Sequence, residues 1–368
     1  KAEDGIRDFC LSRGLGDVYK RQTLSKKSKI KNVDFNNLPF GKIFSDHMFV
    51  CDYFNGKWND ERIIPYSDIK ISPSARVFHY GQAIFEGMKA FKSNDDNILL
   101  FRPDENFKRF NLSSKRLAIP EIPKNIFFSG LNELLKADQK WIKKGIGNSL
   151  YVRPFVIASE ESINASEADF YKFMIICTPA KSYYENQEIW VKIEERYSRA
   201  AKGGVGFAKA SGNYAAQFYP TKVAKNEGFQ QIIWTDSNYH DKIEEAGTMN
   251  LFFRINKELI TSPINDSILD GITRKSIIDI SKSMGLDVIE REITVSELLS
   301  SHESGELKEI FGTGTAVAVL PISGFGYRDK KFLINPKSNK ISIDLKNKLQ
   351  NIQYGITESF SEWQYKVS

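Results

Sequence analysis

One lysine in the second half of the chain is surrounded by residues that favour chemistry at its amine. Lys209 is the one charged residue between Gly203 and Tyr214, a segment of glycines, small residues and a few aromatic ones. Close packing on both sides lowers the pKa of an ammonium group and leaves a nucleophilic amine, which forms Schiff bases with carbonyl compounds. The alternative is a structural lysine whose stem covers apolar surface while its charged end reaches water.

Two short segments downstream of this lysine have the composition of a phosphate site. Gly271 to Arg274 opens a predicted helix, where free N–H groups, the Thr273 hydroxyl and an arginine favour an anion. Gly312 to Ala316 offers further hydroxyls and flexible backbone. Either segment alone could be a helix cap or a turn. Their position in the same half as Lys209 favours a carbonyl cofactor that carries a phosphate.

Pyridoxal phosphate, a cofactor of this kind, also requires an acid beside its ring nitrogen, because the protonated ring is the better electron sink. Glu245 precedes Ala246, Gly247 and Thr248, small residues that let a ring approach. Glu244 stands next to it, and we expect one of these two glutamates to be merely solvated. The histidines are isolated in the sequence, so neither a metal site nor a serine triad is expected.

The elements that must position these residues form an α+β pattern in two units. A hairpin is predicted over residues 48–58 with Asn55-Gly56 as its turn. The other ranges predicted in the first unit are strands at 99–101, 150–157 and 173–177 and helices at 105–117 and 126–144. Those in the second unit are strands at 189–194, 230–235, 249–255 and 309–311 and helices at 213–226, 274–284 and 345–353. We expect a small domain at 32–180, an interdomain loop at 181–188 and a large domain at 189–368.

The bulk composition excludes several classes of protein. The 368-residue chain carries 52 Lys and Arg against 46 Asp and Glu, a formal net charge of +6. Residues 1–31 hold nine of the basic and four of the acidic residues, so the rest is nearly neutral and no nucleic-acid surface is expected. The chain lacks a run of 18 apolar residues, which argues against a membrane span.

The N-terminal segment and the cysteines complete these expectations. Residues 1–31 are expected to be a disordered tail, and residues 1–22 resemble translated adapter sequence, an artefact without function. Cys10, Cys51 and Cys177 are scattered, which argues against disulfides and structural zinc. Scattered cysteines fit a reducing compartment, so a cytoplasmic location is expected.

Several strings of residues occur in an order that resembles one family. They are Phe78 to Phe91, Tyr151 to Pro154, the Lys209 segment, Glu245 to Asn250, Gly271 to Arg274 and Gly314 to Ala316. Together they resemble a branched-chain amino-acid aminotransferase, a pyridoxal-phosphate enzyme of fold type IV, over residues 40–354. The resemblance implies an α+β fold with a smaller N-terminal α/β domain and a larger C-terminal domain with a β-barrel-like core.

The resemblance also implies roles toward the cofactor. Lys209 would bind pyridoxal 5'-phosphate as a Schiff base and would then move the α-proton of the substrate. Glu245 would pair with the ring nitrogen, and Tyr214 would bond to the phenolic oxygen. The remaining contacts would come from Thr248 beside the ring and, around the phosphate, from Arg109, Ile272, Thr273 and Thr315.

Further roles concern the substrate. The backbone amides of Thr315 and Ala316 would hold its α-carboxylate, and Arg153 would bind the second carboxylate of glutamate. Arg153 lies in an apolar strand, where an unpaired charge is costly, so it is expected to be functional or to form a buried pair. The branched side chain would lie among aromatic residues that could equally be ordinary core: Phe40, Tyr80, Phe85, Tyr151 and Tyr183.

The implied activity is reversible transamination of L-leucine, L-isoleucine and L-valine with 2-oxoglutarate by a homodimer. Three segments depart from the family pattern. Val317 to Leu320 replaces the CxxC of some relatives, Ile163 to Ala165 replaces a loop that relatives send to the partner subunit, and residues 178–182 differ at the domain junction. The alternatives are D-amino-acid transamination, elimination of pyruvate from aminodeoxychorismate, or a protein that binds the cofactor without catalysis.

Overall fold

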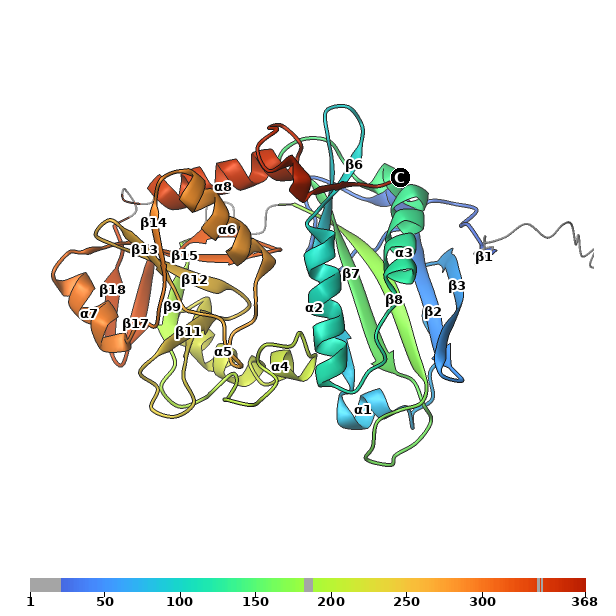
Figure 1. Ribbon diagram of the computed structural model, residues 1–368, viewed down its shortest axis with the longest axis horizontal. Coiled ribbons are helices and arrows are strands. Elements are labelled where there is room, and N and C mark those ends of the chain that lie inside the picture. Colours follow the sequence, from blue (N-terminus) through green and yellow to red (C-terminus); the bar gives the residue numbers. More distant parts are fainter. Residues whose placement is uncertain (1–20, 182–187, 336–337, 339) are drawn as a thin grey trace, which may run out of the picture.

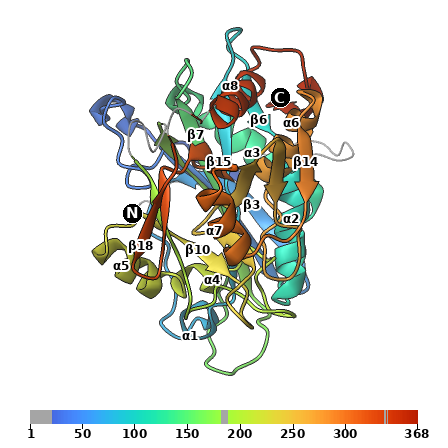
Figure 2. The same cartoon turned by 90° about the vertical axis from the view of Figure 1, so that its left-hand side faces the viewer.

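The computed structural model describes residues 21–181, 188–335, 338 and 340–368. The chain folds into two α+β halves that lie side by side, the N-terminal half in blue to green and the C-terminal half in yellow to red (Figure 1). Helices α6 and α8 lie at one end of the molecule and α1 lies at the other (Figures 1 and 2). The predicted α+β fold class is confirmed.

One nine-stranded sheet forms the N-terminal half, in the order β1-β3-β2-β8-β7-β5-β6-β19 with β4 paired to β7. Its strands are β1 (Arg21–Gln22), β2 (His47–Phe54), β3 (Lys57–Pro65), β4 (Ala83–Phe85), β5 (Met88–Lys92), β6 (Ile98–Phe101), β7 (Ser149–Ala158), β8 (Tyr171–Ala180) and β19 (Gln364–Lys366). The predicted hairpin joins β2 and β3. Asn55 and Gly56 at its tip have φ angles of 51° and 76°, as a tight turn of this twist requires.

Helices α2 and α3 bury their apolar sides against this sheet. The helices of this half are α1 (Arg76–Tyr80), α2 (Pro103–Arg116) and α3 (Lys124–Ala137), with short 3₁₀ turns η1 (Lys29–Asn32) and η2 (Gln139–Trp141). The rings of Phe127 on α3 and Phe173 on β8 are stacked with centroids 6.1 Å apart. Phe110 on α2 packs against both rings, so both helices share one core with the sheet.

The C-terminal half contains two five-stranded sheets that do not close into one barrel within the described ranges. The first consists of β11 (Ile243–Ala246), β10 (Gln231–Thr235), β9 (Trp190–Ile193), β17 (Gly324–Tyr327) and β18 (Lys330–Leu333). The second consists of β14 (Asp287–Glu290), β13 (Glu258–Thr261), β12 (Asn250–Ile255), β15 (Leu307–Gly314) and β16 (Ala318–Pro321). The helices of the C-terminal half are α4 (Gly212–Ala215), α5 (Phe218–Asn226), α6 (Ile272–Ser283), α7 (Val295–Glu303) and α8 (Lys340–Gln353).

Four predicted ranges need correction. The helix expected over 126–144 ends at Ala137. The helix expected over 213–226 is divided into α4 and α5, because Pro220 lacks the N–H group that would bond to the Ala216 carbonyl. Residues 312–314, expected as part of a turn, extend strand β15. Residues 21–31 are ordered rather than a disordered tail, since β1 pairs with β3 and η1 follows.

The end of the chain returns to the N-terminal half. After α8 the chain forms η4 (Ser361–Trp363) and then β19, which pairs with β6 at the edge of the nine-stranded sheet (Figure 1). None of the helices in the described part of the chain is long and apolar enough to cross a membrane. Residues 1–20, which include most of the segment expected to be an artefact, lie outside the described residues.

Candidate active site

A cavity of about 620 Å³ is lined by residues from both halves of the molecule. Nine of the residues predicted for the site line it: Phe40, Phe85, Tyr151, Arg153, Lys209, Tyr214, Thr248, Thr315 and Ala316. Tyr183 lies outside the described residues. The cavity therefore brings together the lysine, the aromatic residues and the predicted carboxylate site.

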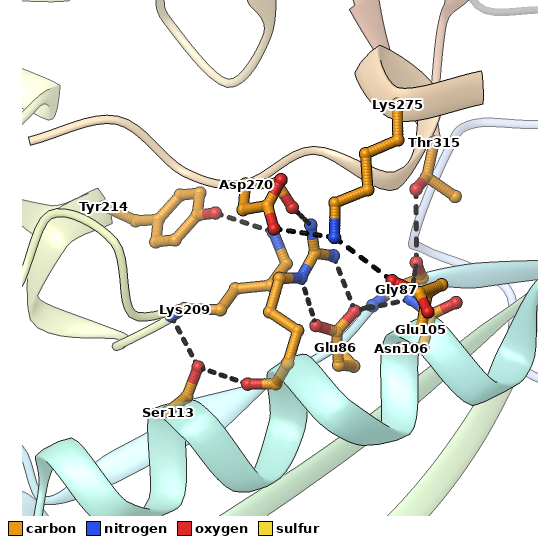
Figure 3. Close-up of polar contacts among 11 residues, drawn as sticks. Glu86, Gly87, Glu105, Asn106, Ser113, Lys209, Tyr214, Asp270, Lys275 and Thr315 are labelled. Atoms are coloured by element: carbon orange, nitrogen blue, oxygen red, sulfur yellow. Dashed lines mark hydrogen bonds and ion pairs between the residues drawn. The ribbon is translucent and has the colours of Figure 1, made fainter. Parts of the chain in front are cut away.

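Lys209 is held at both its backbone and its amine. Its carbonyl accepts a hydrogen bond from the Phe85 N–H at 3.1 Å, so the lysine loop is docked on β4 of the other half. Its own N–H donates to the Ser113 Oγ on α2 at 2.9 Å. Its Nζ donates to the Tyr214 hydroxyl at 2.8 Å (Figure 3). The amine is thus presented to the cavity in one orientation.

An arginine and a helix N-terminus form a site for an anion. Arg109 on α2 donates through Nη1 to the Asp270 carbonyl at 2.9 Å, two residues before α6 begins. Gly271 at the N-cap has no side chain, so α6 has no side-chain cap. The first N–H groups of a helix have no partner within the helix, and those of Ile272 and Thr273 are available to a phosphate.

A fully buried acid that the sequence analysis missed orients this arginine. Glu86 accepts hydrogen bonds from Arg109 Nε at 2.7 Å and Nη2 at 2.9 Å, and a third from Asn106 at 2.7 Å. Burial favours the neutral acid, but the guanidinium of Arg109 holds the pKa of Glu86 below its ordinary value. A charged residue within the apolar string from Phe78 to Phe91 was the available signal.

Glu245, predicted to meet the ring nitrogen, is buried on β11. One carboxylate oxygen lies 2.8 Å from Arg199 Nε, and the other accepts the Leu269 N–H at 3.1 Å. Burial raises the pKa of Glu245, and Arg199 opposes this rise. The expectation that one of the two neighbouring glutamates is merely solvated is wrong, because Glu244 is also buried, with 7% of its surface exposed.

The turn after β15 is fastened to the N-terminal half. The Thr315 hydroxyl, which is predicted to bind phosphate, donates to the Gly87 carbonyl at 3.2 Å. Lys89 Nζ donates to the Ala316 carbonyl at 2.9 Å. These two bonds hold the Thr315 and Ala316 backbone against the cavity wall, on the side where the α-carboxylate was expected.

Aromatic side chains and one guanidinium form the wall of the cavity. The Phe40 and Tyr151 rings meet edge to face with centroids 5.2 Å apart. Arg153 lies over the Phe85 ring at 4.5 Å and donates through Nη2 to the Tyr151 hydroxyl at 3.1 Å. Gly87 is required here, because a Cβ at this position would come within 2.0 Å of that hydroxyl.

Tyr80 lies away from the other predicted substrate residues. Its side chain is 46% exposed, and its hydroxyl donates to the Ile163 carbonyl in the loop that departs from the family pattern. Within the described ranges, no group of three or more His, Cys, Asp or Glu side chains could hold a metal ion. The Lys209 amine therefore lines the cavity, whereas four residues predicted to bind the cofactor are not among its lining residues: Arg109, Glu245, Ile272 and Thr273.

These features define a pyridoxal-phosphate enzyme, and comparison with known proteins agrees. The family model of amino-transferase class IV matches residues 83–325. Branched-chain-amino-acid aminotransferase 2 of Bacillus subtilis (strain 168) is 43% identical over 350 residues, which are 94% of this chain and 96% of that protein. A probable branched-chain-amino-acid aminotransferase of Staphylococcus aureus (strain MRSA252) is 42% identical over 95% of this chain and 98% of its own.

Solved structures show the same fold. The branched-chain aminotransferase of Thermoproteus uzoniensis with norvaline superposes with a TM-score of 0.71 at 24% identity, covering 88% of this chain and all of that one (100%). The branched-chain amino acid aminotransferase of Thermobaculum terrenum in its PLP-form gives a TM-score of 0.70 at 18% identity, covering 87% and 98% of the two chains. The chain belongs to the class IV aminotransferases and, within them, to the branched-chain amino-acid aminotransferase family.

Proposed function

We propose that this enzyme catalyses the reversible transamination of L-leucine, L-isoleucine and L-valine with 2-oxoglutarate, giving branched-chain 2-oxo acids and L-glutamate. The observation that carries the proposal is the position of the Lys209 amine in a cavity with aromatic walls and the Arg153 guanidinium. Aromatic walls suit a branched apolar side chain. A guanidinium suits the second carboxylate of glutamate. The names of the relatives support branched-chain amino acids as the substrates.

The residues present fit pyridoxal 5'-phosphate. Arg109 and the uncapped N-terminus of α6 suit its phosphate, and Glu245 suits its ring nitrogen. The Tyr214 hydroxyl, bonded to Lys209, suits its phenolic oxygen. When bound, the cofactor supplies an electron sink that stabilises the charge left when the substrate loses its α-proton.

The chain's own residues then handle the proton and the carboxylate. Once the Lys209 amine is free, it can accept the α-proton and return it at another carbon, as a general base and acid. Its bonds to Ser113 and Tyr214 fix where that amine lies. The Thr315 and Ala316 backbone can hold the α-carboxylate, because that turn is fastened to Gly87 and Lys89.

The same enzyme is proposed to act as a homodimer. Three apolar side chains near one end of the N-terminal half are largely exposed: Phe78 at 61%, Tyr80 at 46% and Ile163 at 68%. The Tyr80 hydroxyl donates to the Ile163 carbonyl, so these two exposed residues belong to one surface patch. Light scattering on the purified protein measures the mass directly.

The reaction is tested by titrating the purified, cofactor-loaded enzyme with single amino acids while its visible absorbance is recorded. We expect L-leucine to convert the absorbance to that of the aminated cofactor, and 2-oxoglutarate to restore it. D-Alanine should have no effect. A response to D-alanine alone would indicate D-amino-acid transamination, and no response to any amino acid would indicate a non-catalytic protein. Lys209→Ala should bind cofactor without turnover.

A further inference from the structure

Glu245, the acid proposed to face the ring nitrogen, is itself paired with a second buried charge. The side chains of Arg199 and Glu245 are 4% and 5% exposed, and Arg199 Nε lies 2.8 Å from Glu245 Oε1. Neither Arg199 nor Glu245 lines the cavity, and Arg199 was not predicted from the sequence. Its contact with Glu245 means that it would act on the cofactor through that carboxylate.

Arg199 also contacts the segments that lead to the lysine and to the phosphate site. Its Nη2 donates to the Gly206 carbonyl at 2.9 Å and to the Ser267 carbonyl. Gly206 lies three residues before Lys209, and Ser267 belongs to the segment that runs into α6. The packing is tight, because a Cβ at Gly206 would come within 2.5 Å of the Ala200 Cβ. The guanidinium therefore has little freedom to leave Glu245.

The surroundings of Glu245 make its charge depend on this contact. Burial disfavours the carboxylate, and Arg199 is the cation in direct contact with it. Lys209 and Arg109 favour the carboxylate from farther away, whereas the neighbouring Glu244 carboxyl disfavours it. Removal of the guanidinium charge would thus remove the strongest favourable electrostatic contribution to the carboxylate.

We propose that Arg199 is a positioning residue that keeps the negative charge on Glu245 and thereby keeps the proton on the cofactor's ring nitrogen. The proposal rests on the proposed function. One proton is shared between the Glu245 oxygen and the ring nitrogen. The proton can lie on the ring nitrogen, which leaves Glu245 as a carboxylate, or on Glu245, which leaves the ring neutral. A cation beside the carboxylate favours the first state, and both states hold the same number of protons.

The test follows the ring nitrogen directly by nuclear magnetic resonance of the enzyme loaded with ¹⁵N-labelled pyridoxal phosphate, without substrate. Arg199→Gln keeps amide donors but loses the charge, and we expect its ¹⁵N resonance to move from the protonated to the neutral range. Arg199→Lys keeps the charge and should retain the protonated signal. Arg196→Gln, an exposed arginine in the same segment, is the matched control and should match the wild type.

A protonated ¹⁵N signal in folded Arg199→Gln enzyme would overturn the proposal. If that variant does not fold, the wild-type enzyme still gives an answer. Its infrared difference spectrum against Glu245→Gln should contain a carboxylate band for Glu245, and a protonated-acid band would overturn the proposal. These readouts need no turnover, so they are separable from the proposed function, which fails if the loaded wild type does not respond to L-leucine.

Discussion

At the scale of single residues, the site depends on buried charges that neutralise one another. The pairs Glu86–Arg109 and Glu245–Arg199 have side chains no more than 9% exposed. A buried charge without its partner is strongly destabilising, so each pair must be kept intact. The sequence predicted Glu245 from the small residues that follow it, and the family resemblance predicted Arg109. It did not predict their partners, because local patterns do not show which distant residues will meet.

Glu244 is a buried acid that contributes to the pH dependence of stability. Burial raises its pKa from 4.5 to about 7, and one of its oxygens has no hydrogen-bond partner among the described residues. The folded state therefore binds more protons than the unfolded chain between these two values. Stability should fall as the pH rises from about 4.5 to about 7 and should stay at the lower level above that range.

Glu244→Gln should remove this loss. At pH 8 we expect the variant to be more stable than the wild type by about 2 kcal/mol, less than full linkage because water reaches part of the group. At pH values near 4 the two proteins should be equally stable, since glutamine resembles a protonated glutamate. Urea unfolding at a series of pH values measures the difference. A constant difference across the series would contradict the raised pKa.

At the scale of elements, the sequence predicted most strands and helices but not how they join. The β2–β3 hairpin was predictable because Asn55-Gly56 specifies a tight turn by itself. The division between α4 and α5 at Ala216 and Gln217 was missed, although Pro220 was the local signal. The bond from Thr315 to Gly87 depends on how the halves meet, which a local pattern does not contain.

The N-terminus of α6 is an element whose position depends on one glycine. A Cβ on Gly271 would come within 1.9 Å of the Asn250 Oδ1, so Gly271→Ala should push the first turn of α6 away from its place. We expect cofactor affinity to fall about tenfold to a hundredfold, as when one or two hydrogen bonds to a charged group are lost. Equilibrium titration of the apoenzyme with pyridoxal phosphate measures this.

Gly212→Ala is the matched control for this helix start. A Cβ on Gly212 would have no atom within 4 Å, and it lies closer in sequence to Lys209. We expect its cofactor affinity to equal that of the wild type. Equal affinities for the Gly271 and Gly212 variants would show that the amides of α6 do not hold the phosphate.

At the scale of the whole molecule, the site depends on polar contacts that hold the two halves together. Lys275 on α6 forms ion pairs with Asp270 at 2.7 Å and with Glu105 on α2 at 3.1 Å (Figure 3). Arg102 at the start of α2 bonds to the Ser276 Oγ on α6 at 3.0 Å. The anion site therefore takes its arginine from one half and its helix N-terminus from the other, at a junction made of several polar contacts.

The returning C-terminal segment stabilises this junction through Trp363. Its ring lies 4.4 Å from the Arg102 guanidinium carbon, and its carbonyl accepts the Arg102 N–H at 2.7 Å. Trp363→Ala should lower the free energy of unfolding by about 1–3 kcal/mol through lost apolar burial and lost cation–π contact. Because Arg102 also bonds to α6, cofactor affinity should fall together with stability.

Urea unfolding measures the stability of the Trp363 variant, and cofactor titration measures its affinity. The control is Phe170→Ala, at an exposed aromatic residue, which should change neither quantity. Lost stability with unchanged cofactor affinity would show that the segment supports only the N-terminal half.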